Sequence, residues 1–136
     1  MIHGGNTAGR REASVAPAHR CCTRASGNPR ASPGMAPEAA LQGSAGAGLH
    51  PGLRTEPIEL VLRKGYHADI DSYSAFVEND RATRTGFAGY MRERGFTRIF
   101  CAGLALDYCV RYSAEDAREL GFEAVVVTDA CRGPRG

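Results

Sequence analysis

Residues 98–110, with the sequence RIFCAGLALDYCV, decide the fold of this chain. The apolar run at residues 98–103 is typical of a buried strand, and a helical pattern at residues 107–120 follows after a short turn. Cys109 lies near the start of that predicted helix, where unpaired backbone N–H groups and the positive end of the helix dipole favour a thiolate. We therefore interpret Cys109 as a nucleophile that the second half of the chain presents.

Length and composition indicate one domain that neither binds nucleic acid nor crosses a membrane. The chain has 136 residues and a formal net charge of +2, which is too small to indicate a nucleic-acid partner. No apolar run approaches the roughly 20 residues that span a bilayer, and no apolar segment of a secretory signal follows the first residues. Five cysteines without a repeating spacing argue against a disulfide framework, so we expect free thiols and a cytoplasmic location.

Residues 1–48 are predicted to lie outside the folded core. They are rich in Gly, Ala, Ser, Pro and Arg, and their few large apolar residues follow neither a strand period nor a helix period. Such a segment cannot bury enough apolar area to offset the entropy of ordering it, so we expect disorder. The adjacent Cys21 and Cys22 lack the spacing of a zinc site and are interpreted as incidental thiols.

Alternating strands and helices are expected from about residue 49 onward. Strands are predicted at residues 58–64, 98–103 and 123–128, and helices at residues 85–94 and 107–120. Residues 66–80 are polar and aromatic without a clear period and are predicted to form a loop. The alternation predicts an α/β fold with a parallel sheet that is covered on both faces.

The carboxyl ends of the predicted strands meet at one edge of the sheet, which is where ligands bind in such folds. Lys64 ends the first predicted strand, Cys109 follows the second, and Asp129 and Cys131 end the third. A lysine ammonium stabilises both a thiolate and the negative charge that grows on an attacked carbonyl. The turn at residues 103–108 can supply backbone N–H groups as an oxyanion hole.

The general base is left open by the sequence. His67 is the nearest candidate, although a lone histidine in a polar loop is commonly just solvated. Asp71 and Asp107 are the other candidates, and Asp107 is equally suited to cap the helix that follows it.

Cys101 lies inside an apolar strand and is interpreted as a small buried hydrophobe. A dinucleotide-binding α/β unit is the least favoured interpretation of the function, because no G-x-G-x-x-G follows any predicted strand.

Four motifs in order resemble those of nicotinamidases, within the isochorismatase-like cysteine hydrolases. They are the nucleophile segment at residues 103–110, the lysine segment at residues 63–65, and residues 71–76 and 129–133. The resemblance runs from about residue 41 to residue 133. It implies a three-layer fold, a parallel sheet flanked by helices, which is incomplete in this chain. The family deamidates nicotinamide to nicotinate and ammonia in pyridine nucleotide salvage, and commonly acts on pyrazinamide, so the implied partner is a small molecule.

The resemblance also implies roles for individual residues. Cys109 matches the nucleophile and Lys64 the lysine of an Asp–Lys–Cys triad. The thiolate attacks the amide carbon, ammonia leaves, and water hydrolyses the thioester. The backbone N–H groups of Ala105 and Cys109 match the oxyanion hole, and Leu104 and Tyr108 belong to the same substrate-binding turn. A cis peptide bond is expected between Leu104 and Ala105.

The chain departs from the family upstream of these motifs. The first strand, which carries the triad Asp, has no counterpart here, and Leu106 stands where the family usually has Thr. The family holds a divalent metal, which can be zinc, iron or manganese, with Asp and His ligands that this chain lacks. Residues 36–40 align with one metal segment, but Ala replaces both its Trp and its His.

We hypothesise that residues 1–40 come from a shifted reading frame or a wrong start, joined to a partial hydrolase domain at residues 41–136. Translation of the upstream DNA in the other frames tests this hypothesis. An alternative to an active amidohydrolase is a catalytically dead remnant, or pseudoenzyme, that retains a binding or interaction role.

Overall fold

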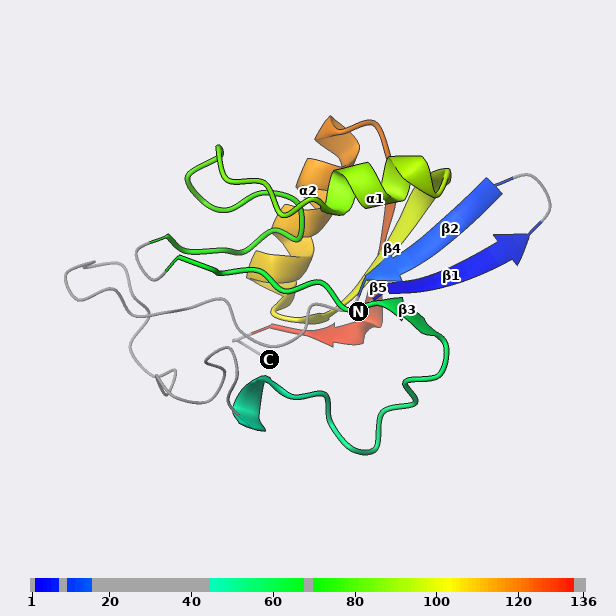
Figure 1. Ribbon diagram of the computed structural model, residues 1–136, viewed down its shortest axis with the longest axis horizontal. Helices are drawn as coiled ribbons and strands as arrows, with labels where there is room; N and C mark the ends of the chain where they lie inside the picture. Colours follow the sequence, from blue (N-terminus) through cyan, green and yellow to red (C-terminus); the bar gives the residue numbers. More distant parts are fainter. Residues whose placement is uncertain (1, 8–9, 16–44, 68–69, 134–136) are drawn as a thin grey trace.

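Five strands form one mixed sheet in the order β3-β1-β2-β4-β5 (Figure 1). The computed structural model describes residues 2–7, 10–15, 45–67 and 70–133. The strands are β1 (Ile2–Thr7), β2 (Arg10–Val15), β3 (Ile58–Leu60), β4 (Phe96–Leu104) and β5 (Glu123–Arg132). The helical elements are η1 (Ala45–Ala47), α1 (Phe87–Glu93), η2 (Leu106–Val110) and α2 (Arg111–Glu119).

The strands that carry the predicted site all run in the same direction. β2, β4 and β5 are mutually parallel, whereas β1 is antiparallel to both β2 and β3. β3 therefore points the same way as β4 and β5, and the carboxyl ends of these three strands share one edge. The predicted α/β fold with a parallel sheet is confirmed, with β1 as an antiparallel exception.

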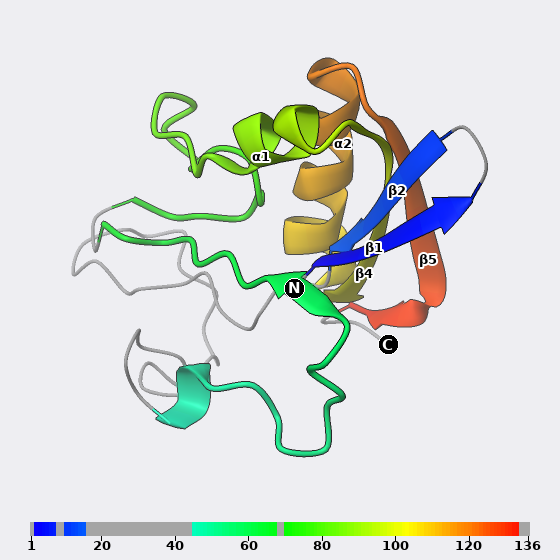
Figure 2. The same cartoon turned by 45° about the vertical axis from the view of Figure 1, so that its right-hand side comes forward.

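Both α-helices cover the same face of the sheet. The connections from β3 through α1 to β4, and from β4 through α2 to β5, move in the same direction along the sheet, so right-handed crossovers place both helices on one side. Figures 1 and 2 show this arrangement from two directions. In the part of the chain that the structure describes, the second helical layer of the predicted three-layer fold is not seen.

The core lies between this face and the two helices. Phe87 and Met91 of α1 and Ala117 of α2 are fully buried against Ile99 and Cys101 of β4. These positions follow a helical stripe in α1 and α2, from which the sequence predicted both helices. In β4 they alternate every two residues, although the sequence predicted this strand from its continuous apolar run. Among the described residues, no helix is long and apolar enough to span a bilayer.

The prediction that residues 1–48 hold no ordered structure was wrong for β1, β2 and the short helix η1. β1 and β2 lie in the middle of the sheet, and β2 pairs with β4 from Arg11 opposite Phe96 to Val15 opposite Cys101. Strand pairing is made by backbone N–H and C=O groups. The edge of β4 carries a row of these groups, which can pair with any extended segment. A pattern of apolar side chains cannot report such pairing. Residues 16–44, with Cys21 and Cys22, lie outside the described residues.

Other element boundaries differ from the predicted ones. β3 ends at Leu60 and not at residue 64, because β1 pairs with it only at Ile58 and Leu60. β5 continues to Arg132, since its last residues pair with Gly103 and Leu104 of β4 after an irregularity in the register. The chain from residue 61 to Lys64 is therefore an irregular segment that leads from the sheet edge into the site.

Candidate active site

Lys64 and Cys109 meet at the carboxyl edge of the sheet. The ammonium nitrogen Nζ of Lys64 lies 3.6 Å from the sulfur of Cys109. Lys64 comes from the segment that follows β3, and Cys109 comes from η2, directly after β4. The thiol of Cys109 is partly exposed, so a small molecule can reach it. The predicted juxtaposition of the two side chains is confirmed.

Two backbone carbonyls of a neighbouring loop hold the lysine. Nζ of Lys64 donates to the carbonyl oxygens of Ser72, at 2.6 Å, and Tyr73, at 2.8 Å. An ammonium has donors and no acceptor, so Lys64 Nζ is the donor in its contact with the sulfur of Cys109. Sulfur must then act as the acceptor, which a thiolate does better than a thiol. The geometry therefore favours the reactive form of the cysteine.

The loop that holds the lysine is also tied to the helix that carries the cysteine. The hydroxyl of Ser113 in α2 donates to the carbonyl oxygen of Cys109, at 2.6 Å, and accepts the N–H of Ala75, at 2.9 Å. Ser113 is 3% exposed. Ser72, Tyr73 and Ser113 were not predicted to take part in the site. The signal for Ser72 and Tyr73 was the alternation of small polar and aromatic residues in the motif at residues 71–76.

The turn between β4 and η2 has the backbone that the family resemblance implies. The peptide bond between Leu104 and Ala105 is cis. The carbonyl oxygen of Ala105 accepts the N–H groups of Tyr108, at 3.1 Å, and Val110, at 3.2 Å, which starts η2. The role of this turn as an oxyanion hole stays a prediction.

Asp107 does not cap the helix, contrary to one of its two predicted roles. The N-cap of η2 is Ala105, and no side chain makes a capping hydrogen bond there. The carboxylate of Asp107 instead lies against Gly133, where an added Cβ would stand 3.1 Å from its Oδ1. The chain after β5 therefore passes close to the start of η2.

Three tyrosine rings lie next to the nucleophile. The rings of Tyr73 and Tyr108 are 5.5 Å apart between centroids, and Tyr73 is equally far from Tyr112. Tyr108 and Tyr112 are 40% and 38% exposed. Flat aromatic surfaces beside a cysteine suit a planar ring as the substrate.

The other predicted candidates lie in different surroundings. His67 is exposed, and its charge contributes to the lowered pKa of Asp80, whose main cause is the hydrogen bond from Thr83. Asp71 is half-buried, and its backbone oxygen accepts the N–H of Asn79. Asp129 is exposed on β5. The base roles of His67, Asp71 and Asp107 stay predictions.

Cys101 of β4 and Cys131 of β5 are unsuited to nucleophilic attack because both are buried. Burial, with a smaller contribution from Cys131, raises the pKa of Cys101 to about 11, so its thiol stays protonated. Cys131 is buried, and its thiol donates to the carbonyl oxygen of Val127, at 3.1 Å. The interpretation of Cys101 as a small buried hydrophobe is confirmed.

The described residues do not fit the divalent metal that the family implies. Residues 45–67 and 70–133 contain no group of three or more His, Cys, Asp or Glu side chains arranged around a common point. The imidazole of His50 accepts the N–H of Gly52 through Nδ1, at 3.1 Å, on the protein surface. The described residues therefore supply no ligand set for a metal ion.

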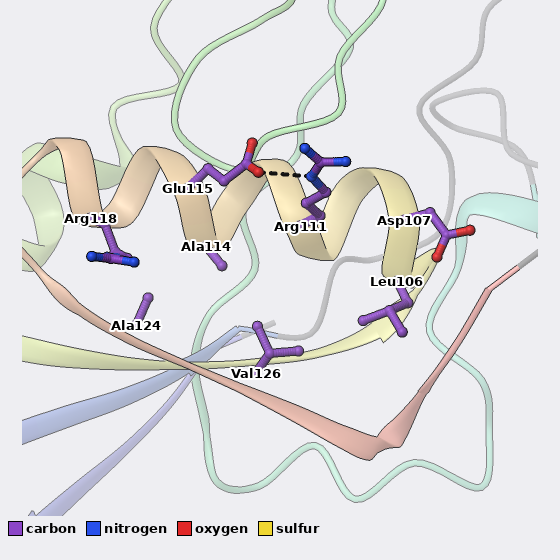
Figure 3. A pocket seen from close by; sticks show the side chains of 8 residues that line it. All are labelled: Leu106, Asp107, Arg111, Ala114, Glu115, Arg118, Ala124 and Val126. Carbon is purple, nitrogen blue, oxygen red and sulfur yellow. Dashed lines mark hydrogen bonds and ion pairs between the residues drawn. The ribbon is translucent and has the colours of Figure 1, made fainter.

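A hollow of about 520 Å³ lies between α2 and β5, apart from Lys64 and Cys109 (Figure 3). Its floor is apolar, with Leu106, Ala114 and Val126 among its lining residues. Arg111 at its rim is paired with Glu115, at 2.7 Å, one turn further along α2. Of the residues predicted to take part in the reaction or in substrate binding, Asp107, a candidate base, lines this hollow, whereas Lys64 and Cys109 do not.

Comparison with known proteins assigns the chain to a family. The model of the isochorismatase domain matches residues 11–135. The chain belongs to the isochorismatase family. It is 47% identical over 96 residues to the nicotinamidase of Acinetobacter baylyi, which covers 71% of this chain and 45% of that protein. It is 37% identical over 97 residues to the nicotinamidase/pyrazinamidase of Mycobacterium tuberculosis, which covers 71% of this chain and 50% of the relative.

A solved structure of the family has the same arrangement. PnC1 of L. infantum in complex with nicotinate superposes with a TM-score of 0.68 at 46% identity, covering 74% of this chain and 50% of that one. The chain thus spans about half the length of the relatives it matches. The resemblance to nicotinamidases and the isochorismatase-like fold are therefore confirmed.

Proposed function

We propose that the chain carries the lysine–cysteine part of a nicotinamidase centre and hydrolyses nicotinamide to nicotinate and ammonia. The observation that carries this proposal is the approach of Lys64 Nζ to Cys109 Sγ, at 3.6 Å, with the ammonium held by two carbonyls. The identity to nicotinamidases and the nicotinate in a related structure support the substrate class. Pyrazinamide, a similar planar amide, is a second substrate to test because one relative is named for it.

The proposed reaction passes through a thioester on Cys109. The thiolate attacks the amide carbon, and the ammonium of Lys64 stabilises the charge that this step moves onto the substrate. The carbon–nitrogen bond then breaks, and the nitrogen leaves as ammonia after it takes a proton from the ammonium of Lys64. Water attacks the resulting nicotinoyl thioester. One of the two protons of water returns to the amine of Lys64 and the other is released with nicotinate, which restores the thiolate of Cys109. The backbone at Ala105 and Cys109 is the proposed oxyanion site, with Leu104 and Tyr108 beside the substrate.

A binding protein without activity is the second candidate. The lack of a metal-ligand group within the described residues favours this candidate, because the family resemblance implies a divalent metal. The tyrosine rings and the partly exposed Cys109 would remain as a site for a pyridine-like ligand. The three described cysteines are free thiols, which supports the proposed cytoplasmic location for either candidate.

Ammonia release from nicotinamide by the purified chain decides between the two candidates. The proposal predicts release that is lost in Cys109→Ala and strongly reduced in Lys64→Ala. It also predicts a nicotinoyl adduct on the peptide that contains Cys109 when the reaction is quenched in acid. Activity that survives in Cys109→Ala would overturn the nucleophile assignment. Nicotinate binding without ammonia release would establish the binding protein.

A further inference from the structure

Glu78 is a buried carboxylate that the proposed chemistry does not use. It is 1% exposed, and its Oε1 accepts the backbone N–H of Gly65 at 2.9 Å. Its other oxygen, Oε2, has no hydrogen-bond partner within the described residues. Burying a carboxylate is costly unless it gains interactions in return, so a residue of this kind needs a reason to be there.

The contact of Glu78 is made directly beside the proposed catalytic lysine. Gly65 follows Lys64 in the chain and has a φ of 72°, a left-handed conformation in which the chain turns away after the lysine. An added Cβ on Gly65 would stand 3.8 Å from Cβ of Ser72, so this turn packs against the loop whose carbonyl holds the ammonium. The lysine is thus fixed at its head by carbonyls and at its backbone by Glu78.

The backbone of Glu78 is itself firmly anchored. Its N–H donates to the carbonyl oxygen of Thr83, at 2.8 Å, and its own carbonyl oxygen accepts the N–H of Arg81, at 2.9 Å. Asp80 closes this turn by accepting the N–H groups of Ala82 and Thr83, at 3.0 and 2.9 Å. Because the backbone of Glu78 is fixed by these hydrogen bonds, its carboxylate can hold Gly65 in a defined position.

We propose that Glu78 is the positioning residue that sets the backbone of Lys64 so that its ammonium reaches the sulfur of Cys109. The inference rests on the proposed roles of Lys64 and Cys109. Without the Oε1 acceptor, the hydrogen bond that Glu78 accepts from the N–H of Gly65 is lost, and the turn shifts. Because the attraction between two charges falls with distance, a displaced ammonium stabilises the thiolate less.

The test measures how fast iodoacetamide alkylates Cys109 as a function of pH, read from the mass of the Cys109 peptide. Lys64→Ala is expected to raise the pH midpoint of alkylation by roughly 1–2 units. Glu78→Ala is expected to give at least half of that rise. Its alkylation rate at neutral pH then falls by at least about 3-fold to 10-fold, because the thiolate fraction falls tenfold for each unit that the midpoint rises. The control Glu115→Gln, at an exposed carboxylate paired with Arg111 on α2, is expected to match the unchanged chain.

Two conservative variants separate position from charge. Glu78→Gln keeps an oxygen acceptor at the same reach and is expected to rescue the midpoint. Glu78→Asp keeps the charge but is one methylene shorter, and is expected to behave like Glu78→Ala. The opposite result would be a Glu78→Asp midpoint like that of the unchanged chain and a raised midpoint in Glu78→Gln. It would show that the charge of Glu78 matters and not its position, and would overturn the proposal. Loss of folding in Glu78→Gln would overturn it in favour of a purely structural carboxylate.

The same experiment keeps this inference apart from the proposed function. If Lys64→Ala leaves the midpoint unchanged, the lysine–thiolate pair itself is wrong and the proposed function fails. If Lys64→Ala raises the midpoint but Glu78→Ala does not, the pair stands and Glu78 does not position it. The readout needs no turnover, so it applies whether or not the chain hydrolyses nicotinamide.

Discussion

The hydroxyl of Ser113 donates a hydrogen bond of 2.6 Å to the carbonyl oxygen of Cys109, one helical turn before it. The same hydroxyl accepts the N–H of Ala75 at 2.9 Å, so one buried side chain joins the cysteine helix to the loop that holds the lysine. The partners of the proposed active site are therefore fixed to each other through a single serine and not only through the sheet.

Replacement of Ser113 by alanine is expected to lower the free energy of unfolding by about 1–3 kcal/mol. The cause is the N–H of Ala75, which would be left buried without an acceptor. Urea unfolding followed by circular dichroism measures the loss. Ser72→Ala is the matched control, because Ser72 is equally buried but its hydroxyl has no hydrogen-bond partner among the described residues. An equal loss of unfolding free energy in both variants would show that the hydrogen bonds of Ser113 are not the cause of the loss.

A second prediction concerns the ion pair between Arg81 and the buried Asp116. Nη1 of Arg81 lies 2.7 Å from Oδ1 of Asp116, and this hydrogen bond is the main cause of the raised pKa of Arg81. Arg81→Ala leaves the carboxylate of Asp116 buried without its cation. Because Arg81 is itself half exposed, we expect a loss of about 2 kcal/mol, below the value for a fully buried pair.

The ion pair between Arg81 and the exposed Glu119 provides the control for this prediction. Nη2 of Arg81 lies 3.1 Å from Oε2 of Glu119, whose side chain is 68% exposed. Glu119→Gln is expected to cost less than about 0.5 kcal/mol in the same unfolding experiment. Asp116→Asn in the Arg81→Ala background is expected to recover part of the lost stability, because the uncompensated charge is removed. If the double variant recovers none of it, the loss does not come from the unpaired carboxylate.

The elements with a side-chain period were predictable from the sequence. β4, α1 and α2 bury Ile99, Phe87 and Ala117 at the spacing of their elements, and the pattern located each of them within a few residues. β1 and β2 were missed because their place in the sheet depends on main-chain pairing with β3 and β4. Their own residues lack the sustained alternation of large apolar and polar side chains that marks a half-buried strand.

The site was predictable only where side chains carry the chemistry. Lys64 and Cys109 are rare, reactive residue types at the ends of strands, and a parallel sheet brings such ends together. The carbonyls of Ser72 and Tyr73 are backbone groups that every residue has, so no residue type marks them. Glu78 could have been suspected from the apolar residues Phe76 and Val77 before it, which indicate a buried environment.

A third prediction tests the tyrosines beside the nucleophile. Tyr73→Leu removes the ring that lies 5.5 Å from both Tyr108 and Tyr112 but keeps the carbonyl that holds Lys64. Loss of an aromatic contact is expected to weaken nicotinate binding by about 5-fold, or about 1 kcal/mol. A nicotinate titration followed by NMR measures it. Tyr66→Leu, at a tyrosine that is 57% exposed, is the control and should bind nicotinate like the unchanged chain.

The last prediction uses the pKa of Cys101, which burial raises from 9.0 to about 11. The folded chain holds this proton more tightly than the unfolded chain, so the stabilisation is fully present below about pH 9 and is lost as the pH rises through about 11. The free energy of unfolding should therefore fall by at most about 3 kcal/mol across this interval because of Cys101 alone.

Cys101→Val removes the ionisable thiol while keeping a small apolar side chain in the core beneath the helices. Urea unfolding at a series of pH values from about 8 to 11 should give a shallower fall in stability for this variant than for the unchanged chain. All other titrating groups are common to both chains, so the difference between the two slopes reports Cys101. Parallel slopes would mean that the thiol reaches solvent before the chain unfolds, and that β4 is not held as tightly between its neighbours as the burial of Cys101 indicates.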